Sequence, residues 1–391
     1  MKVESYVNSE ETVELLKSLI KINSVNPSLV EGGAGEAEIA EFVAGFLEDV
    51  GLEAKVIEIE KSRANAVGVL KGKGKGPSLM LNGHMDTVGV KQMTIPPFEP
   101  RVEGNKIYGR GSADMKGGLA AMMSAAKAIV ESGAELMGDL IVAGVADEEY
   151  ASIGTERLVK DVSADAAIVC EPTDLKIVIA HKGFVWMGID TWGKAAHGSR
   201  PDLGVDAIMK MGRVLKEIEE LQREALPKRR HKLLGNPSIH ASIIEGGREL
   251  STYPDHCRLQ LEVRTLPGQT VESVRGEIQK ILDKLSKEDS QFKADLDIMF
   301  ERDPLEVSPK EDIVKTLRGA NYAVTGMKTE FAGMSGWLDS EIIWKAGTPA
   351  VIFGPGGEGF HAAIEYAYAD QVVTAAKILS RTIASFCGCR C

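Results

Sequence analysis

The chain has 391 residues, of which 44% are hydrophobic and 26% are charged, a composition typical of a folded protein of two or three domains. This composition excludes a disordered chain, a collagen-like repeat and a disulfide-rich miniprotein. The formal net charge of −11 makes nucleic acid an unfavourable partner, and the apolar runs are too short to span a membrane.

The first 180 residues predict alternating helices and strands. Asn8 and Glu11 resemble a capping box before a helix over 13–20, and a second amphipathic helix runs from Glu36 to a terminating Gly51. Strands are expected at 55–59, 65–70, 78–82, 139–146 and 166–170, and helices at 117–131 and 155–160. The glycine-rich segment 72–76 is expected to be a hairpin loop. This alternation predicts an α/β sheet covered on both faces.

The pattern changes after residue 177. Strand, helix, strand, strand, helix and strand follow one another over about 120 residues, which predicts a compact α+β sandwich. After Pro304 the α/β alternation resumes, with a strand at 350–353 and a last helix from Gln371. We therefore expect a discontinuous larger domain, 1–180 with 304–391, and an inserted smaller domain, 181–303. The basic run 223–232 is expected to be a solvated loop.

The cysteines and the first residues bear on the cellular compartment. Three of the five cysteines, Cys387, Cys389 and Cys391, lie at the C-terminus. An odd, clustered set is no disulfide framework, and the first residues lack the apolar segment of a secretory signal. We therefore expect a reducing cytoplasm and a frayed C-terminal tail with free thiols, although the tail could instead bind a soft metal or cross-link chains.

Five segments place acids or histidines beside glycines at the ends of apolar strands. These residues are His84 and Asp86, Asp114, Glu148 and Glu149, Glu171, and His361. Each alone could be structural. Together they offer imidazole and carboxylate ligands with one shareable aspartate, which suits two divalent ions such as zinc, with Asp114 bridging; cobalt and manganese also suit the set. Ligands scattered along the chain favour a catalytic centre over a structural zinc knot.

The motifs GHMDTV, GRGSADMKGG, DEE, EP and GPG followed by a histidine resemble those of the dinuclear zinc acylases and carboxypeptidases. That family includes acetylornithine deacetylase, succinyl-diaminopimelate desuccinylase, aminoacylase and glutamate carboxypeptidase, and the resemblance covers essentially the whole chain. It implies a zinc-peptidase-like α/β/α catalytic domain, and it implies that the inserted two-layer α+β domain is a lid that also forms a homodimer.

The resemblance also implies a role for each matching residue. His84 and Glu171 would hold one metal, His361 and Glu149 the other, and Asp114 would bridge them. Glu148 would be the general acid/base, Asp86 would orient His84, and the Asp114–Met115 peptide would be cis. His197 in the lid would stabilise the oxyanion in the partner's active site, and Arg264 would bind the substrate carboxylate. Ser251 stands where many relatives have an asparagine, so the substrate contacts there are open.

The resemblance implies hydrolysis of an amide bond in a small molecule with a free carboxylate. We favour removal of an acyl group from an N-acyl amino acid, of the acetylornithine or succinyl-diaminopimelate type. A dipeptidase or carboxypeptidase of the same family is the alternative. A catalytically silent, metal-binding dimeric interaction protein is the alternative from another class, but such a protein would be expected to lose a ligand or the base.

Overall fold

The chain forms two compact units in a computed structural model that describes residues 2–390. The larger unit comprises Met1–Ile179, Val307–Ala332 and Leu338–Cys391, and the smaller unit comprises Ala180–Glu306 and Gly333–Trp337. The expected boundaries differ from these units chiefly at 333–337. This segment belongs to the smaller unit because Gly333 lies against Leu234 and the Trp337 ring meets Phe184 edge-on, with ring centroids 6.4 Å apart.

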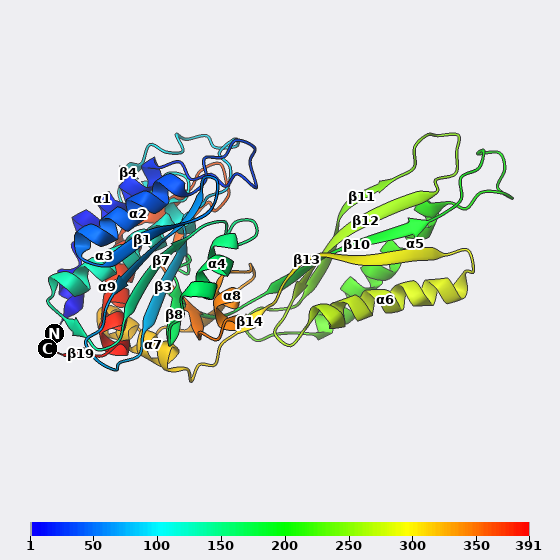
Figure 1. The fold of residues 1–391 in the computed structure, drawn as a ribbon. Helices are drawn as coiled ribbons and strands as arrows, with labels where there is room; N and C mark the ends of the chain where they lie inside the picture. The colour runs from blue at the N-terminus through cyan, green and yellow to red at the C-terminus, as the bar shows by residue number, and fades with distance from the viewer. Residues whose placement is uncertain (1, 391) are drawn as a thin grey trace. The chain divides into compact units, whose positions relative to one another are not determined.

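A mixed β-sheet with the strand order β1-β2-β7-β3-β8-β16-β9 forms the centre of the larger unit (Figure 1). The strands are β1 Glu53–Glu60, β2 Arg63–Leu70, β3 Leu79–His84, β7 Leu140–Val145, β8 Ala166–Val169, β9 Ile177–His181 and β16 Ala350–Ile352. Neighbours from β7 to β16 run parallel. Strands β3, β7 and β8 are buried throughout, as expected for parallel strands covered on both faces.

Helices cover both faces of this sheet. They are α1 Ser9–Lys21, α2 Ala37–Val50, α3 Gly117–Glu131, α4 Ile153–Asp161, α7 Asp312–Thr325, α8 Ser340–Lys345 and α9 Ala369–Phe386. In β2, Gly68 faces Leu47 of α2, whereas the Asn65 amide donates to the Gly154 carbonyl of α4. Residues 65 and 68 point to opposite faces of a strand. The predicted α/β/α arrangement is therefore confirmed.

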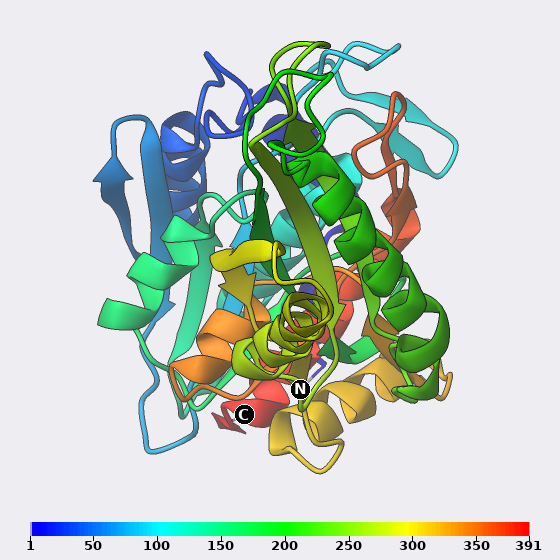
Figure 2. The same cartoon turned by 90° about the vertical axis from the view of Figure 1, so that its right-hand side faces the viewer.

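Local signals explain where the first two helices begin and end. The Asn8 side chain accepts hydrogen bonds from the backbone amides of Glu10 and Glu11, and it caps α1 as predicted. Gly51 ends α2 with a φ of 104°. A short helical turn, η1 Val3–Tyr6, packs against α9, so segments near the two ends of the chain lie side by side (Figure 2).

The glycine-rich segment 72–76 does not close a hairpin, so that expectation is wrong. Strand β7 lies between β2 and β3, and it pairs with both. The segment instead lies alongside residues 136–138 in space. The Lys73 backbone amide donates to the Leu136 carbonyl at 2.8 Å, and the Gly74 amide donates to the Met137 carbonyl at 3.0 Å. The actual hairpin joins β1 to β2.

The C-terminal tail is paired rather than frayed, which corrects a second expectation. Strand β19, Cys389–Arg390, pairs with β6, Glu135–Leu136. Cys387 is buried, and its carbonyl accepts from the Gly138 amide at 3.0 Å. Cys391 lies outside the described residues. A small sheet completes the unit, with β4 Arg101–Glu103, β5 Lys106–Tyr108, β17 Gly357–Glu358 and β18 Tyr366–Tyr368 in the order β17-β18-β5-β4.

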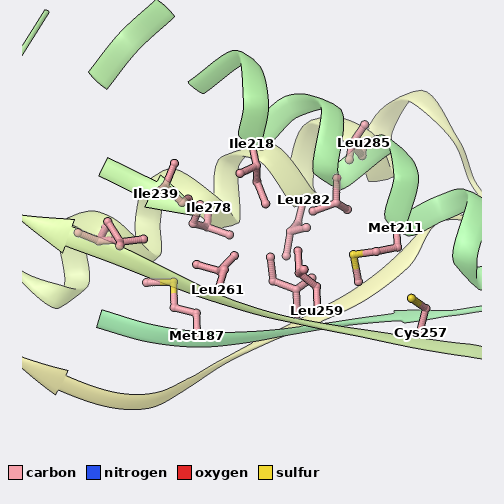
Figure 3. Packing of buried hydrophobic residues seen from close by; sticks show 14 of the residues in the cluster. Met187, Met211, Ile218, Ile239, Cys257, Leu259, Leu261, Ile278, Leu282 and Leu285 are labelled. Atoms are coloured by element: carbon pink, nitrogen blue, oxygen red, sulfur yellow. The ribbon is translucent and has the colours of Figure 1, made fainter. Parts of the chain in front are cut away.

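The smaller unit is a two-layer α+β sandwich, as predicted. Its elements are β10 Gly183–Trp192, α5 Ala207–Glu220, β11 Ser238–Gly246, β12 His256–Thr265, α6 Val271–Glu288 and β13 Lys293–Arg302. The sheet order is β11-β12-β10-β13. Every second residue of β12 is buried, and Leu259 and Leu261 pack with Met211, Ile278 and Leu282 of the two helices (Figure 3).

The remaining short elements connect these parts. They are η2 Ser112–Lys116, η3 Leu221–Ala225, η4 Leu226–Lys228, β14 Leu305–Glu306 and β15 Phe331–Met334. The expected basic loop 223–232 contains the end of η3 and all of η4. From this segment Arg229 pairs with Glu277 at 2.7 Å and His231 pairs with Glu306 at 3.1 Å. None of the helices within residues 2–390 combines the length and the apolarity needed to cross a bilayer.

Candidate metal centre and active site

The candidate site gathers at the carboxyl ends of the parallel strands of the larger unit. His84 is the last residue of β3, Glu171 follows β8, and Glu148 and Glu149 lie in the turn after β7. These three strands are neighbours, so the residues that follow them meet at one edge of the sheet. The structure therefore brings together residues that are far apart in the sequence.

The first ligand cluster consists of His84, Asp114 and Glu171. The His84 Nε2 atom lies 3.2 Å from Asp114 Oδ1 and 3.7 Å from Glu171 Oε1. His84 and Glu171 are almost completely buried, with 1% and 3% of their side chains exposed. One nitrogen and two carboxylate oxygens thus converge on one small volume.

The second cluster shares Asp114 with the first. The His361 Nε2 atom lies 3.3 Å from Asp114 Oδ2 and 3.0 Å from Glu149 Oε2. His361 follows β17 and has a φ of 59°, a left-handed conformation that is uncommon outside glycine. Its side chain is 53% exposed, so this cluster is open on one side. The two oxygens of Asp114 therefore face different histidines.

The residues present fit two divalent cations. Among the described residues, the buried atoms Glu149 Oε1 and Glu171 Oε1 have no hydrogen-bond partner. A buried carboxylate oxygen normally finds a donor, so an unpartnered one in a ligand cluster indicates a missing positive charge. Two imidazoles and three carboxylates are the donor set of a borderline divalent ion.

The electrostatics of the clusters agree with this assignment. Hydrogen bonds to Asp114 and Glu149 raise the pKa of His361 to about 10. Burial lowers the pKa of His84, but the Glu171 charge and the hydrogen bond to Asp114 outweigh this effect and leave it well above its usual value. Burial, followed by the charge of Asp114, raises the pKa of Glu149 to about 6. The clusters therefore attract positive charge, either protons or metal cations.

Glu148 lies beside the clusters but belongs to neither of them. Burial, reinforced by the charge of Glu171, raises the pKa of Glu148 well above its ordinary value. A carboxylate with a raised pKa binds a proton more readily than an ordinary one, as a general acid/base must. The backbone amide of Glu148 donates to Asp86 Oδ1 at 3.1 Å, which fixes the start of this turn.

Asp86, which was expected to orient His84, lies closer to the His84 ring through its backbone carbonyl than through its carboxylate. The His84 Nδ1 atom lies 3.0 Å from the backbone carbonyl oxygen of Asp86 and 3.5 Å from its carboxylate. The carboxylate also accepts hydrogen bonds from the backbone amides of Glu148 and Glu149, at 3.1 and 3.2 Å. Asp86 therefore contacts both His84 and the turn that follows β7.

Several supporting residues were missed by the sequence analysis. The Glu365 carboxylate accepts from the backbone amides of Ala113 and Asp114, and Asp147 and Asn26 lie beneath the Glu148 turn. Glu365 stands four residues after His361 in the GPGGEGFHAAIE segment, so the sequence could have pointed to it. Asn26 and Arg63, whose guanidinium donates to Asp147 Oδ1 at 2.7 Å, stand in no such motif. The peptide bond between Asp114 and Met115 is cis, as expected.

Three predicted residues lie in the smaller unit. His197 is exposed, and its Nδ1 atom lies 2.8 Å from Ser199 Oγ. The loop of Ser251 lies next to His197, because the Ser251 backbone carbonyl accepts a hydrogen bond from the Gly198 amide at 2.7 Å. Arg264 lies on β12, where its Nε donates to Glu262 at 2.7 Å and its guanidinium carbon lies 5.2 Å from the centre of the Phe184 ring. The roles of these residues remain predictions.

The fold and the paired clusters define a class: a metallohydrolase with an α/β/α domain and an inserted α+β domain. Residues 80–385 match the model of peptidase family M20/M25/M40, and the chain belongs to this family. The chain is 30% identical to an N-formyl-4-amino-5-aminomethyl-2-methylpyrimidine deformylase of Bacillus subtilis (strain 168), over 99% of this chain and 96% of that protein. It is 29% identical to an acetylornithine deacetylase of Myxococcus xanthus, over 93% of each.

Solved structures share the same fold. A tripeptidase from Staphylococcus aureus superposes with a TM-score of 0.81 at 22% identity, covering 97% of this chain and 99% of that one. A dinuclear metal-binding peptidase of the M20 family from Bacillus subtilis superposes with a TM-score of 0.74 at 14% identity, covering 97% and 98%. The predicted family is therefore confirmed, and the chain is a hydrolase that acts on amide bonds.

Proposed function

We propose that this protein is a metal-dependent deacylase that hydrolyses the amide bond of an N-acyl amino acid. The observation that carries the proposal is the position of Asp114 between two histidine–glutamate pairs, with Glu148 beside them. His84 and Glu171 would hold one ion and His361 and Glu149 the other. Zinc suits these ligands best, and cobalt and manganese are the alternatives. Divalent ions at such a site polarise a carbonyl group and acidify water.

Glu148 performs the proton transfers in this proposal. Its carboxylate takes a proton from the attacking water and then delivers it to the nitrogen of the leaving amine. Its burial next to Glu171 supports this role, because a raised pKa makes the carboxylate a stronger base. Asp86 holds the backbone of Glu148 and so fixes the direction from which the carboxylate acts.

The substrate in this proposal carries a free carboxylate that binds Arg264. The Arg264 Nε donates to Glu262, and the face of the guanidinium lies over the Phe184 ring. The Nη1 and Nη2 atoms are therefore available to bind a carboxylate. Ser251 lies with His197 at the other end of β12 from Arg264, so a substrate contact made by Ser251 would accompany that of His197. The curated relatives named above are a deformylase and a deacetylase, which favours an acyl amide over a peptide bond. A dipeptidase or carboxypeptidase is the second candidate.

A homodimer forms part of the proposal. Strand β11 is an edge of its sheet, and Ile243 and Ile244 on it are 51% and 50% exposed. Met209 of α5 is 69% exposed. An exposed apolar edge strand is a surface that pairs with another chain, and a second copy supplies the matching edge. In such a dimer His197 of one subunit would stabilise the oxyanion in the active site of the partner.

A reducing, cytoplasmic location also belongs to the proposal. Cys170, Cys257 and Cys387 are buried free thiols. Burial raises the pKa of the Cys170 thiol. Burial also raises the pKa of the Cys387 thiol, to about 12, so both thiols stay protonated and unreactive. These thiols are packing residues, and they suit a compartment in which cysteines stay reduced.

The test is release of free amine from a panel of N-acetylornithine, N-succinyl-diaminopimelate, N-formyl amines, other N-acyl amino acids and dipeptides. Each substrate is offered to metal-loaded and to chelator-stripped protein. We expect metal-dependent turnover of an N-acyl substrate. Turnover of dipeptides alone would favour the second candidate, and no turnover of any substrate with two bound ions per chain would contradict the proposal.

The acid/base assignment has its own test. Glu148→Gln should keep two metal ions per chain and lower kcat by about 1,000-fold, because the amide cannot carry the proton. Glu131→Gln, on the exposed end of α3, is the control and should leave both quantities unchanged. If Glu148→Gln kept most of the activity, another group would have to be the base.

A further inference from the structure

A buried ionic network lies beneath the turn that carries Glu148 and Glu149. Its members are Glu36, Arg63, Asp86, Asp147 and Asn26, and each has 1% or less of its surface exposed. The Arg63 guanidinium donates from Nε to Glu36 Oε2 at 2.6 Å and from Nη2 to Asp147 Oδ1 at 2.7 Å. It therefore connects the segment before α2 with the segment after β7.

The network continues from Asp147 to the site itself. The Asn26 side-chain amide donates to Asp147 Oδ1 at 2.9 Å and to Asp86 Oδ2 at 2.8 Å. The Asp86 carboxylate accepts from the backbone amides of Glu148 and Glu149. Two carboxylates thus hold the turn, and Asn26 sets the distance between them.

The second oxygen of Asp147 fixes the other end of the turn. Asp147 Oδ2 accepts from the backbone amides of Ala151 and Ile153, at 3.2 and 3.4 Å. Asp147 itself has a φ of 73°, so the chain reverses sharply at this residue. The conformation that presents Glu148 to the site is consequently fixed from both sides by hydrogen bonds to carboxylates.

Charge makes Arg63 the decisive member of this network. Glu36, Asp86 and Asp147 are three buried carboxylates, and Arg63 is the cation that contacts two of them directly. Burying a charged group is costly unless it is paired and hydrogen-bonded. Without the guanidinium, Asp147 Oδ1 would keep only the Asn26 donor, so the carboxylate would shift and the turn that it holds would move with it.

We propose that Arg63 is a positioning residue for Glu148. It acts through Asp147 and Asn26, and its guanidinium donates to Glu36, Ser28 and Asp147, none of which belongs to a ligand cluster. The inference rests on the proposed role of Glu148, because it explains how that carboxylate is held at the site. A small displacement of a reacting group lowers the rate strongly even when binding is retained.

The test compares Arg63→Lys and Arg63→Ala with the wild type and with Arg381→Ala. Arg381 forms an ion pair with Glu4 in the same unit at 2.7 Å, so this control removes a guanidinium remote from the turn. Arg63→Lys keeps the charge, but it cannot donate to Glu36 and Asp147 in the same fork-like geometry. Arg63→Lys is the variant that is measured if Arg63→Ala does not fold.

We expect Arg63→Ala to lower kcat by about 100-fold with KM changed less than about threefold and with two ions still bound per chain. Added guanidinium ion should restore part of the kcat of Arg63→Ala, and Arg63→Lys should be intermediate. Arg381→Ala should match the wild type. Wild-type kcat in both Arg63 variants, or a kcat loss that follows metal loss and is not rescued, would overturn the proposal.

A second measurement does not depend on turnover. Hydrogen exchange of the backbone amides in 148–153 should become at least about tenfold faster in Arg63→Lys, while exchange in β3 and α3 stays unchanged. Unchanged exchange in 148–153 would overturn the positioning role. If Glu148→Gln retained activity while this exchange still accelerated in Arg63→Lys, the acid/base assignment would fail and the structural link between Arg63 and the turn would stand.

Discussion

The Glu365 carboxylate is the main hydrogen-bond acceptor for the loop that presents Asp114. Its Oε1 atom accepts from the amides of Ala113 and Asp114, at 3.0 and 3.1 Å. Its Oε2 atom accepts from the Gly111 amide at 3.0 Å and from Arg110 Nη1 at 2.7 Å. Because Glu365 and Arg110 are each 1% exposed, water cannot replace these contacts.

Glu365→Gln tests this arrangement with almost no change in size. A glutamine offers one acceptor oxygen, so two of the four donors would face its NH2 group. A hydrogen bond to a charged group contributes about 1.5–3 kcal/mol, and breaking a buried ion pair costs about 3–5 kcal/mol. Arg110 keeps one other contact, from Nη2 to the Ala362 carbonyl at 3.1 Å. We therefore expect a loss near the lower limit, about 3 kcal/mol.

The assay is urea unfolding of chelator-stripped protein, so that bound metal does not contribute to the free energy of unfolding. Glu358→Gln is the control, because Glu358 is exposed and the Tyr368 hydroxyl that donates to its carboxylate can also donate to a glutamine oxygen. We expect the control to change stability by less than about 0.5 kcal/mol. A loss below about 1 kcal/mol in Glu365→Gln would refute the reasoning, since it would mean that the loop does not depend on this carboxylate.

Three further outcomes are expected. Burial lowers the pKa of His181 from 6.5 to about 4, so the unfolded chain binds the proton first, and stability present above pH 6.5 should fall by up to about 3 kcal/mol as the pH drops toward 4. Urea unfolding at several pH values should show a weaker pH dependence in His181→Gln, and parallel curves would exclude this cause. Leu261→Ala should cost about 3 kcal/mol by cavity formation, whereas Ile244→Ala on the exposed edge should cost little. Ile243→Lys should give monomers in sedimentation, with metal retained and turnover lowered; a fully active monomer would contradict the dimer proposal.

Glu365 and Arg63 support the two sides of the candidate site in the same way. Each is a buried charged group that lies outside both ligand clusters, and each fixes a segment through several hydrogen bonds. One holds the loop of Asp114 and the other holds the turn of Glu148. The ligands and the proposed base therefore depend on supporting residues that are themselves neither ligands nor the base.

The sequence alone predicted most local structure. The residue pattern predicted a strand where β12 lies, helical periodicity predicted α2, Asn8 marked the start of α1 and Gly51 marked the end of α2. The histidine and carboxylate residues were visible because each follows an apolar strand or a glycine turn. These features are local, because side-chain periodicity and helix caps depend on residues only a few positions apart.

Tertiary structure decided what no local pattern encodes. Strand β7 lies between β2 and β3, so the 72–76 loop is no hairpin, and the tail pairs with β6. Asn26 meets Asp86 across 60 positions, and Arg110 meets Glu365 across 255. Such contacts form only when packing buries the partners together. Burial then favours the pairing, because an unpaired charge in the interior costs much free energy.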